Sequence, residues 1–434
     1  MIHNGHDPRQ KRPKVLMYLT LLTTTGGGPS AATQLATTLA DRGHEVEVFT
    51  RPPFDAAHRY ARILAERGIR VHVFERLDER YAAVTRVAAA FLILPCFVRR
   101  GFNARSAWLT AKSVSAAWLA RIERAGIRRR LARAIATDRP SILHVWGPAA
   151  LTPLLLDWAD RRDLPAVYHE MGEADEQYVE TWSLQPTLER INLARAVICC
   201  SSTVADCIRS AYRYRGPVAT VPFMVAEPSD LVAPRARDAN VLTLGAIGRL
   251  VPHKRHVDLV RAVRALRDEG EHVRLVVGGS GPSRGDLERL CRDLGVQDRV
   301  EFIGEFEQLD DVMRRFDVFA LTSSSESQCM PITESMAYGK PAIVSAIGGM
   351  PDFVEHGVTG FVVPLDDRDA LVSAIRRFIA EPDLIDRMGA EARRRYCERY
   401  HPAAIANAIE GVYSGVMAAT GRMHAGPVDI PCAS

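Results

Sequence analysis

Residues 322–340, TSSSESQCMPITESMAYGK, decide the fold of the second half of this chain. They follow a short apolar run, residues 317–321, that ends abruptly in small polar residues, as a buried strand does where it enters a loop. Pro331 suits the first turn of a helix, where its missing N–H costs nothing, and Gly339 is placed to end that helix. The stretch therefore predicts a strand, a loop and a helix, the unit of a parallel α/β sheet.

Two glutamates of this stretch lie eight residues apart. Glu326 belongs to the predicted loop and Glu334 to the first turns of the helix. The first helical N–H groups, those of Met330, Ile332 and Thr333, are expected to be free and to face the carboxyl end of the strand, where open α/β sheets bind ligands. The pattern predicts a phosphorylated ligand whose hydroxyl groups are bound by two carboxylates; a solvated surface pair is the alternative.

The overall composition is that of a soluble globular protein with two domains. The chain has 434 residues, 47% hydrophobic and 25% charged, with a formal net charge of +4, which gives no reason to expect nucleic acid as a partner. Its eight cysteines form no CxxC pair, as is usual in a reducing compartment. No signal-like segment and no run long enough to span a bilayer is evident, so a cytoplasmic protein is predicted.

Apolar strands alternate with helical segments over residues 14–225, after a tail at 1–13. The predicted first strand, 14–22, is followed by the glycine-rich TTTGGGPS and a helix, which is a Rossmann-like opening. Six more strands complete this first α/β domain. They are predicted at 44–50, 69–74, 142–146, 166–168, 196–200 and 218–221.

A segment rich in Pro and charge, residues 226–240, predicts a linker to a second α/β domain at 241–400, followed by a closing helix at 401–420 and a tail at 421–434. The strands of this domain are predicted at 241–245, 273–277, 300–303, 317–321, 342–344 and 360–363. The expected fold class is α/β, with two Rossmann-like doubly wound domains, a cleft between them for the ligand, and C-terminal helices packing back.

The helical segment 85–135 does not fit a plain Rossmann domain. Residues 87–98 are apolar, and residues 99–133 carry ten Lys or Arg against one acid, Glu123, with Trp108 and Trp118 between them. A basic amphipathic helix with aromatic residues is typical of a peripheral membrane contact, here at the inner membrane face. Helices packed on the core of their own domain, or a basic face for an anionic acceptor, remain alternatives.

Two further glycine-containing turns follow predicted strands of the second domain. In GRLVPHK, Gly248 precedes Arg249, which offers a forked pair of donors to a diphosphate, and Lys254, which supplies a point charge. The turn GGSGP contains Gly279, which is expected beside a nucleotide. It is not a GxGxxG fingerprint, which argues against NAD.

These motifs together resemble glycosyltransferase family 4, retaining enzymes of the GT-B fold. The resemblance rests on GRLVPHK, VVGGSGP, RVEFIGEF and the long run from DVFALTSSSESQCMPITESMAYGK to GFVVP, and it covers residues 241–379 in the expected order and spacing. The first domain is similar only through GGG after its first strand. The resemblance implies a nucleotide-diphosphate sugar as substrate.

The resemblance implies roles for individual residues. Glu326 and Glu334 match the EX7E pair, the first on the donor sugar and the second on the nucleotide ribose, and Arg249 with Lys254 match the basic pair on the diphosphate. The remaining donor-binding positions that it implies are Gly27 and Gly28 beneath sugar and phosphates and Gly304 with Glu305 at the base. The family usually needs no metal, so no cofactor is expected, and the DxD at 367–369 is interpreted as a solvated loop.

Several positions depart from the family pattern. Gln328 and Cys329 stand where Phe-Gly is common, which is expected to reshape the sugar pocket, and Asp352 replaces a common Glu. An H-x-H element of the first domain keeps its first residue, His144, and has Trp at the second, while His169 after the next strand is another candidate for a catalytic histidine. The alternative for both is a structural hydrogen bond.

The sequence thus predicts a metal-independent, retaining hexosyltransferase-type enzyme that moves a sugar from a nucleotide diphosphate to a hydroxyl acceptor, such as a glycan, a lipid-linked acceptor or a small molecule. Because no additional carboxylate stands out as a covalent nucleophile, front-face displacement is expected. Acidic residues in the loop after 168, Glu170, Glu173, Asp175 and Glu176, are candidates to meet the acceptor. Alternatives are a non-catalytic sugar-nucleotide-binding protein, a GT-B epimerase and, more distantly, an NAD oxidoreductase.

Overall fold

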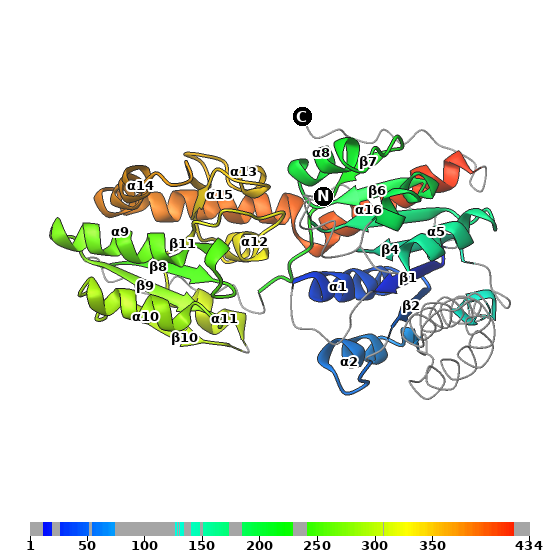
Figure 1. Ribbon diagram of the computed structural model, residues 1–434, viewed down its shortest axis with the longest axis horizontal. Coiled ribbons are helices and arrows are strands. Elements are labelled where there is room, and N and C mark those ends of the chain that lie inside the picture. The colour runs from blue at the N-terminus through cyan, green and yellow to red at the C-terminus, as the bar shows by residue number, and fades with distance from the viewer. Residues whose placement is uncertain are drawn as a thin grey trace, which may run out of the picture. The chain divides into compact units, whose positions relative to one another are not determined.

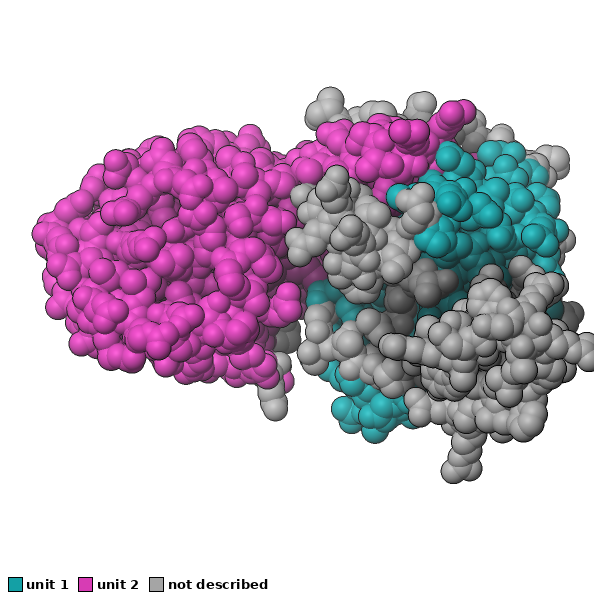
Figure 2. All heavy atoms as spheres, viewed as in Figure 1, with its two compact units in different colours: residues 1–169, 182–195, 416–424 teal, residues 170–181, 196–415, 425–434 magenta. Residues whose placement is uncertain are grey.

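The structure is a computed structural model that describes residues 12–19, 27–51, 54–73, 126–127, 129, 131–133, 140–147, 151–172, 185–228, 241–306 and 308–420. The chain divides into two compact units (Figure 2). Unit 1 holds Met1–His169, Trp182–Arg195 and Val416–His424, and unit 2 holds Glu170–Thr181, Ala196–Gly415 and Ala425–Ser434.

The first sheet has seven strands in the order β3-β2-β1-β4-β5-β6-β7. Its strands are β1 (Val15–Leu19), β2 (Val46–Thr50), β3 (Arg70–Val73), β4 (Ile142–Trp146), β5 (Ala166–Glu170), β6 (Ala196–Cys199) and β7 (Val218–Thr220). β1 pairs in parallel with β2 on one side and β4 on the other. The strand order therefore reverses at β1 and β4, which makes the sheet doubly wound.

The second sheet has six strands in the order β10-β9-β8-β11-β12-β13, of which β8 to β11 are labelled in Figure 1. They are β8 (Leu242–Ile247), β9 (Val273–Gly278), β10 (Val300–Gly304), β11 (Val318–Leu321), β12 (Ala342–Ser345) and β13 (Gly360–Val363). β8 is parallel to both β9 and β11, so the order reverses between β8 and β11. Ligands of open α/β sheets bind at such a switch point, outside the carboxyl ends of the strands.

The longer helices of the first half are α1 (Gly27–Asp41), α2 (Arg59–Glu66), α5 (Thr152–Asp160) and α8 (Ser202–Ser210), with short turns α7 (Gln185–Leu188) and η1 (Ile191–Leu193). Those of the second half are η2 (Pro252–Lys254), α9 (His256–Asp268), α10 (Arg284–Asp293), α11 (Leu309–Met313), α12 (Met330–Ala337), α13 (Met350–Phe353), α14 (Arg368–Ala380), α15 (Asp383–Arg399) and α16 (Pro402–Ala419).

Alternate residues of the second sheet's strands face two separate cores. Val318 and Ala320 pack with α9, α10 and α14, whereas Phe319 and Leu321 pack with α11, α12 and α13. α15 contributes to both cores. Strands buried on both faces read as continuous apolar runs, which is why the sequence located them so closely.

The predicted fold class is confirmed, since both sheets are parallel and carry the predicted strands in two separate sets. The strands 142–146 and 360–363 have the predicted bounds, while β5 is two residues longer than predicted and ends at Glu170. Gly339 ends α12 with φ +64°, and the Lys340 N–H donates to the Ser335 carbonyl at 2.9 Å, as in a Schellman motif.

Two expectations need correction. Gly27 and Gly28 are predicted in a loop, but they are the first residues of α1, which begins four residues before the predicted boundary. Asp367 and Asp369 were expected in a solvated loop; Asp367 instead caps α14 by accepting from the Ala370 N–H at 2.8 Å, and Asp369 lies in the first turn of that helix.

Several predicted features fall largely or wholly outside the described residues. These are the tails at 1–13 and 421–434, most of the segment 85–135 and of the linker 226–240, and the acidic residues Glu173, Asp175 and Glu176. Within the described part of the chain, no helix combines the length and the apolar character that crossing a membrane requires.

Candidate active site

Two loops at the switch point of the second sheet are bound to each other. One follows β8 and carries η2, and the other follows β11 and leads into α12. The Ser324 N–H donates to the His253 carbonyl at 2.8 Å, and the Thr322 hydroxyl donates to the Arg255 carbonyl at 2.9 Å. These bonds bring Lys254 and Glu326, 72 residues apart in sequence, to the same edge of the sheet.

Lys254 and Glu326 form an ion pair with a direct hydrogen bond. Both side chains are largely buried, 13% and 10% exposed, and the Ser323 hydroxyl donates to the same Glu326 oxygen at 2.9 Å. Burial alone would lower the pKa of Lys254, but nearby negative charge outweighs it and raises that pKa above its ordinary value. Cys329 lies beside the pair, and burial raises the pKa of its thiol.

Arg249 lies close enough to Lys254 to oppose its charge and to lower its pKa. Arg249 is exposed, and no carboxylate in the described part of the chain pairs with it. Two cations therefore lie near each other here, and one of them, Lys254, is paired with Glu326. Such an excess of positive charge is suited to an anionic ligand.

Glycines allow three strand ends to approach closely beside these cations. A Cβ at Gly279, whose φ is +124°, would lie 2.0 Å from the Gly248 carbonyl oxygen, which no side chain permits. The Gly279 N–H donates to the Gly304 carbonyl at 2.8 Å. Gly248, Gly279 and Gly304 are thus brought together as the donor-site prediction requires, and Glu305 beside them accepts from the Ser280 hydroxyl.

The amino end of α12 lies in the same loop system, with Pro331 in its first turn and no side chain capping it. The sequence predicted three free N–H groups here, and for one residue this was wrong. The Ile332 N–H donates to the Cys329 carbonyl at 3.0 Å, because the first turn tightens to an i to i−3 bond. Met330 and Thr333 lie at the amino end of α12, as predicted. The Thr333 hydroxyl donates to the Met330 carbonyl at 2.9 Å.

Glu334, the second glutamate of the pair, has an unusual environment. Burial raises the pKa of its carboxyl to about 7. No cation in the described residues pairs with it, so nothing offsets the cost of burying its charge. A carboxylate in this state gains stabilisation from a ligand that donates hydroxyl hydrogen bonds to it.

Two residues that depart from the family pattern, Gln328 and Asp352, form hydrogen bonds within unit 2. Gln328 accepts from the Phe223 N–H at 2.7 Å and donates to the Phe223 carbonyl at 3.3 Å, so its amide is bound to backbone on both sides. Asp352 accepts from the Ser202 N–H at 2.7 Å and the Ser202 hydroxyl at 2.9 Å, at the start of α8. A negative charge at a helix amino end is stabilising.

The two histidines predicted as catalytic lie inside unit 1. His144 and His169 are 0% and 2% exposed, and their rings are 3.3 Å apart from Nε2 to Nδ1. Trp146 packs against His169 with ring centroids 4.0 Å apart. Burial lowers the pKa of His144 to about 3 and that of His169 well below its ordinary value, the latter with a smaller contribution from His144. They form a neutral aromatic cluster.

Glu170 was a candidate to meet the acceptor, and the structure contradicts this. It is fully buried, and its carboxylate accepts from the Tyr212 hydroxyl at 2.6 Å and from the N–H groups of Met171 and Gly172 at 2.7 and 3.1 Å. The carboxylate is therefore used inside the protein. The apolar residues before it, which define β5, indicated a strand end but not the direction of this side chain.

Sequence reasoning missed two residues of this site. Ser323 binds Glu326, and its position in the SSS run after β11 was the only available signal. Arg255 holds the turn after Lys254, with φ +52°. Nothing in the sequence distinguished it from a solvated arginine.

Two family models match the chain in succession. Residues 56–225 match Glycosyltransferase Family 4, and residues 233–395 match Glycosyl transferases group 1. The chain is a family 4-like glycosyltransferase of the GT-B fold. For this glycosyltransferase, the second match covers every residue of the Lys254–Glu326 site described above.

Curated relatives support the assignment over part of their length. The chain is 28% identical over 164 residues to N-acetyl-alpha-D-glucosaminyl L-malate synthase of Bacillus anthracis, covering 38% of this chain and 43% of the relative. It is 34% identical over 205 residues to D-inositol 3-phosphate glycosyltransferase of Streptomyces griseus, covering 44% of this chain and 43% of the relative. The matched region thus spans less than half the length of either relative.

A solved structure matches nearly the whole fold. HepE of Anabaena in complex with UDP superposes with a TM-score of 0.70 at 18% identity, covering 93% of this glycosyltransferase and all of HepE. At this identity the likeness establishes the fold alone.

Proposed function

We propose that this glycosyltransferase moves a sugar from a nucleoside-diphosphate donor to a hydroxyl acceptor. The proposal rests above all on the buried Lys254–Glu326 pair with Arg249 beside it, at the switch point of the second sheet. A sugar diphosphate brings both charges that this arrangement can use. Its phosphates pair with the two cations, and its sugar hydroxyls donate to the carboxylate.

The chemistry follows from the same residues. Cleavage of the sugar–phosphate bond builds negative charge on the leaving diphosphate and positive character on the sugar ring. Lys254 and Arg249 stabilise the first without moving far, since Lys254 is already held at the edge. When the phosphates pair with Lys254, Glu326 is released from its ion pair. Glu326 then binds a sugar hydroxyl and stabilises the cationic ring.

We infer retention by front-face displacement. Glu326 is hydrogen-bonded to Lys254 and Ser323, which suits a binding carboxylate rather than a nucleophile. The departing phosphate oxygen would accept the proton of the incoming hydroxyl. Trapping of a covalent glycosyl-enzyme on a carboxylate would contradict this mechanism, and product anomers determined by NMR would decide between retention and inversion.

UDP-sugars are the first donors to test. HepE was crystallised with UDP and with UDP-glucose, and the latter complex superposes with a TM-score of 0.64. In this chain, Glu334 of α12 would accept the ribose hydroxyls, and Glu305, which directly follows β10, would lie near the base. We expect no metal cofactor, because the two cations already supply the positive charge that a metal would bring.

The test is a panel of UDP-, GDP- and ADP-sugars read by thermal shift and by release of the nucleoside diphosphate. A donor that binds the folded state raises the melting temperature, and release that depends on an added hydroxyl acceptor supports transfer. Binding without release would favour a non-catalytic sugar-nucleotide-binding protein. Conversion of the donor sugar without acceptor product would favour an epimerase, and no binding of any donor would reject the proposal.

The basic segment 87–133 bears on the acceptor and on location. Its charge and tryptophans support peripheral contact with the inner face of a membrane and, with it, a lipid-linked acceptor for a cytoplasmic enzyme. Flotation with anionic liposomes at low salt tests this, with neutral liposomes as the control. Absence of the protein from the floated fraction would contradict membrane contact.

A further inference from the structure

Arg255, which follows Lys254 directly, has a left-handed backbone with φ +52° and ψ +36°. Arg255 joins the end of η2 to the start of α9. Its torsion angles therefore determine how Lys254, the last residue of η2, is oriented relative to α9. A non-glycine residue in this conformation is strained and persists only where its surroundings hold it.

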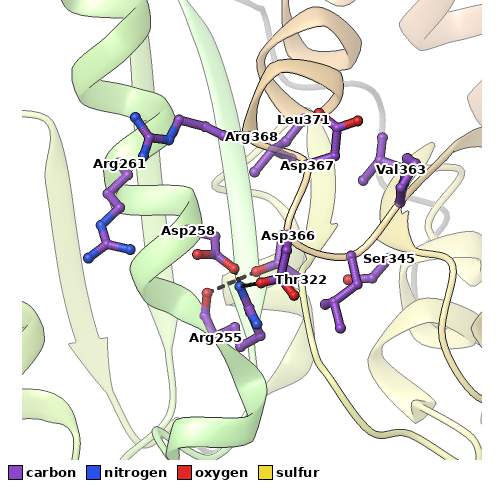
Figure 3. A pocket seen from close by; sticks show the side chains of 12 residues that line it. Arg255, Asp258, Arg261, Thr322, Ser345, Val363, Asp366, Asp367, Arg368 and Leu371 are labelled. Atoms are coloured by element: carbon purple, nitrogen blue, oxygen red, sulfur yellow. Dashed lines mark hydrogen bonds and ion pairs between the residues drawn. The ribbon is translucent and has the colours of Figure 1, made fainter.

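The surroundings hold Arg255 by its side chain and its carbonyl. Its guanidinium donates through Nε to Asp258 at 2.7 Å and through Nη2 to Asp366, while its carbonyl accepts from the Thr322 hydroxyl at 2.9 Å (Figure 3). Asp366 is itself a non-glycine residue with positive φ, +65°. Two residues of strained backbone are therefore joined by one ion pair.

This ion pair lies outside the charged site of Lys254 and Glu326. Arg255, Asp258 and Asp366 line a separate pocket of about 150 Å³ between the starts of α9 and α14 (Figure 3). Of the two carboxylates, Asp258 belongs to α9 itself, whereas Asp366 precedes α14, 111 residues after Arg255. Asp366 is thus the partner that anchors the turn to a distant part of the sheet edge.

We propose that Arg255 and Asp366 form a positioning pair that holds Lys254 at the diphosphate. This proposal rests on the proposed function, in which Lys254 stabilises the negative charge that develops on the leaving diphosphate in the transition state. The pair does not contact the donor. It fixes the left-handed turn, and the turn fixes the ammonium group against Glu326. Without the pair, Arg255 relaxes toward an ordinary right-handed conformation and Lys254 leaves its place.

The test compares Arg255→Gly and Asp366→Asn with a matched control, Asp298→Asn. Glycine populates left-handed and right-handed conformations about equally, so Arg255→Gly removes the guanidinium contacts and leaves the turn without the ion pair that selects its left-handed form. Asp298 forms a similar exposed pair with Arg267 at 3.1 Å, away from the site. Each is measured for melting temperature and, with the donor that the wild type uses, for kcat and donor KM.

We expect kcat to fall roughly tenfold in both test variants, with a smaller change in KM, because displacing a catalytic group by about 1 Å can cost up to a hundredfold. The double variant should be no slower than the slower single one, since the two residues act as one unit. Asp298→Asn should retain wild-type kinetics. Wild-type kcat in Arg255→Gly or Asp366→Asn, or additive losses in the double variant, would overturn the proposal.

A second measurement is independent of turnover. The rate at which an amine-acylating reagent modifies Lys254 is followed by peptide mass spectrometry. Lys254 is 13% exposed and paired in the wild type, so its labelling should accelerate in Arg255→Gly and Asp366→Asn but not in Asp298→Asn. Unchanged labelling would overturn the positioning pair. A wild type inactive on every nucleotide sugar would instead reject the proposed function, whatever the labelling result.

Discussion

The carboxyl edges of the two sheets differ in chemistry although both sheets are doubly wound and parallel. In the second sheet, the edge gathers paired and unpaired charges, Lys254, Glu326 and Arg249, around closely packed glycines. In the first, β4 and β5 carry a neutral, buried cluster of His144, Trp146 and His169. The same topology therefore presents charge at one edge and aromatic packing at the other, because loops and side chains, not strand order, supply the chemistry.

The two sites also differ in whether they reduce the stability of the protein as the pH falls or as it rises. The buried histidines exclude protons that the unfolded chain binds below about pH 6.5, so they reduce stability as the pH falls from that value. Glu334, with a pKa of about 7 against 4.5 in an ordinary environment, retains a proton that the unfolded chain releases, so it reduces stability as the pH rises from 4.5 through 7. Each edge can therefore be tested by its own titration.

The largest effect is expected from removing the charge of Lys254. Lys254→Met should lower kcat/KM about 10²- to 10³-fold, because a fixed cation is lost where the leaving diphosphate develops charge. Arg274→Met, at an exposed position of β9, serves as the control and should change little. Steady-state kinetics on folded protein measures both. Transfer at the wild-type rate by Lys254→Met would remove the distinction between the two edges.

Glu334→Gln should separate binding from stability. We expect donor KM to rise about tenfold, since a ribose hydroxyl loses a charged acceptor. The free energy of unfolding at pH 8 should rise by about 1–3 kcal/mol, because a partly buried charge is removed. Denaturant melts at pH 5 and pH 8 and donor titrations measure these effects, with Glu301→Gln, at an exposed position of β10, as the control. A variant that is no more stable at pH 8 would contradict the burial of this charge.

The wild type should show the same residue in its pH profile. If ribose hydroxyls donate to ionised Glu334, the donor affinity falls as the pH drops below about 7. In Glu334→Gln this dependence should vanish. Isothermal titration with the nucleoside diphosphate between pH 6 and 8 measures it, and an equal slope in both proteins would assign the titration to another group.

His144→Asn tests the neutral cluster. Between pH 6.5 and 4.5 the wild type should lose about 2–3 kcal/mol of stability through His144, and the variant should lose correspondingly less. His272→Asn, which replaces an exposed histidine, is the control. Urea melts at the two pH values provide the measurement. If His144→Asn instead kept the acid sensitivity and lost kcat at pH 7.5, the catalytic role predicted from sequence would be supported over a structural one.

The smallest effect is expected from a metal chelator. Transfer in excess EDTA should remain within about twofold of the untreated rate, because Lys254 and Arg249 supply the charge that a divalent cation would otherwise bring. Nucleoside diphosphate release is measured with and without the chelator, and again after Mg²⁺ is restored. A loss that Mg²⁺ reverses would show that the charged edge is incomplete without a metal.

The sequence by itself determined the strands, because strands buried on both faces are continuous apolar runs such as 142–146 and 360–363. It also predicted which loops meet at one edge of the sheet, since Lys254, Glu326 and Gly279 follow the ends of parallel strands. Only the tertiary structure decided which polar groups are already used inside the protein. Glu170 and Ile332 were predicted to face ligands, yet hydrogen bonds to residues of the fold engage them.

The same reason explains Arg255 and the two histidines. Local sequence carries periodicity and turn chemistry, but a side chain's burial and partners depend on segments far away in the chain, such as Asp366 for Arg255. His144 resembled a catalytic residue from its place near a strand end, and packing against His169 and Trp146 is what makes it neutral and buried. Strand positions follow from local pattern, whereas charge state follows from long-range contacts.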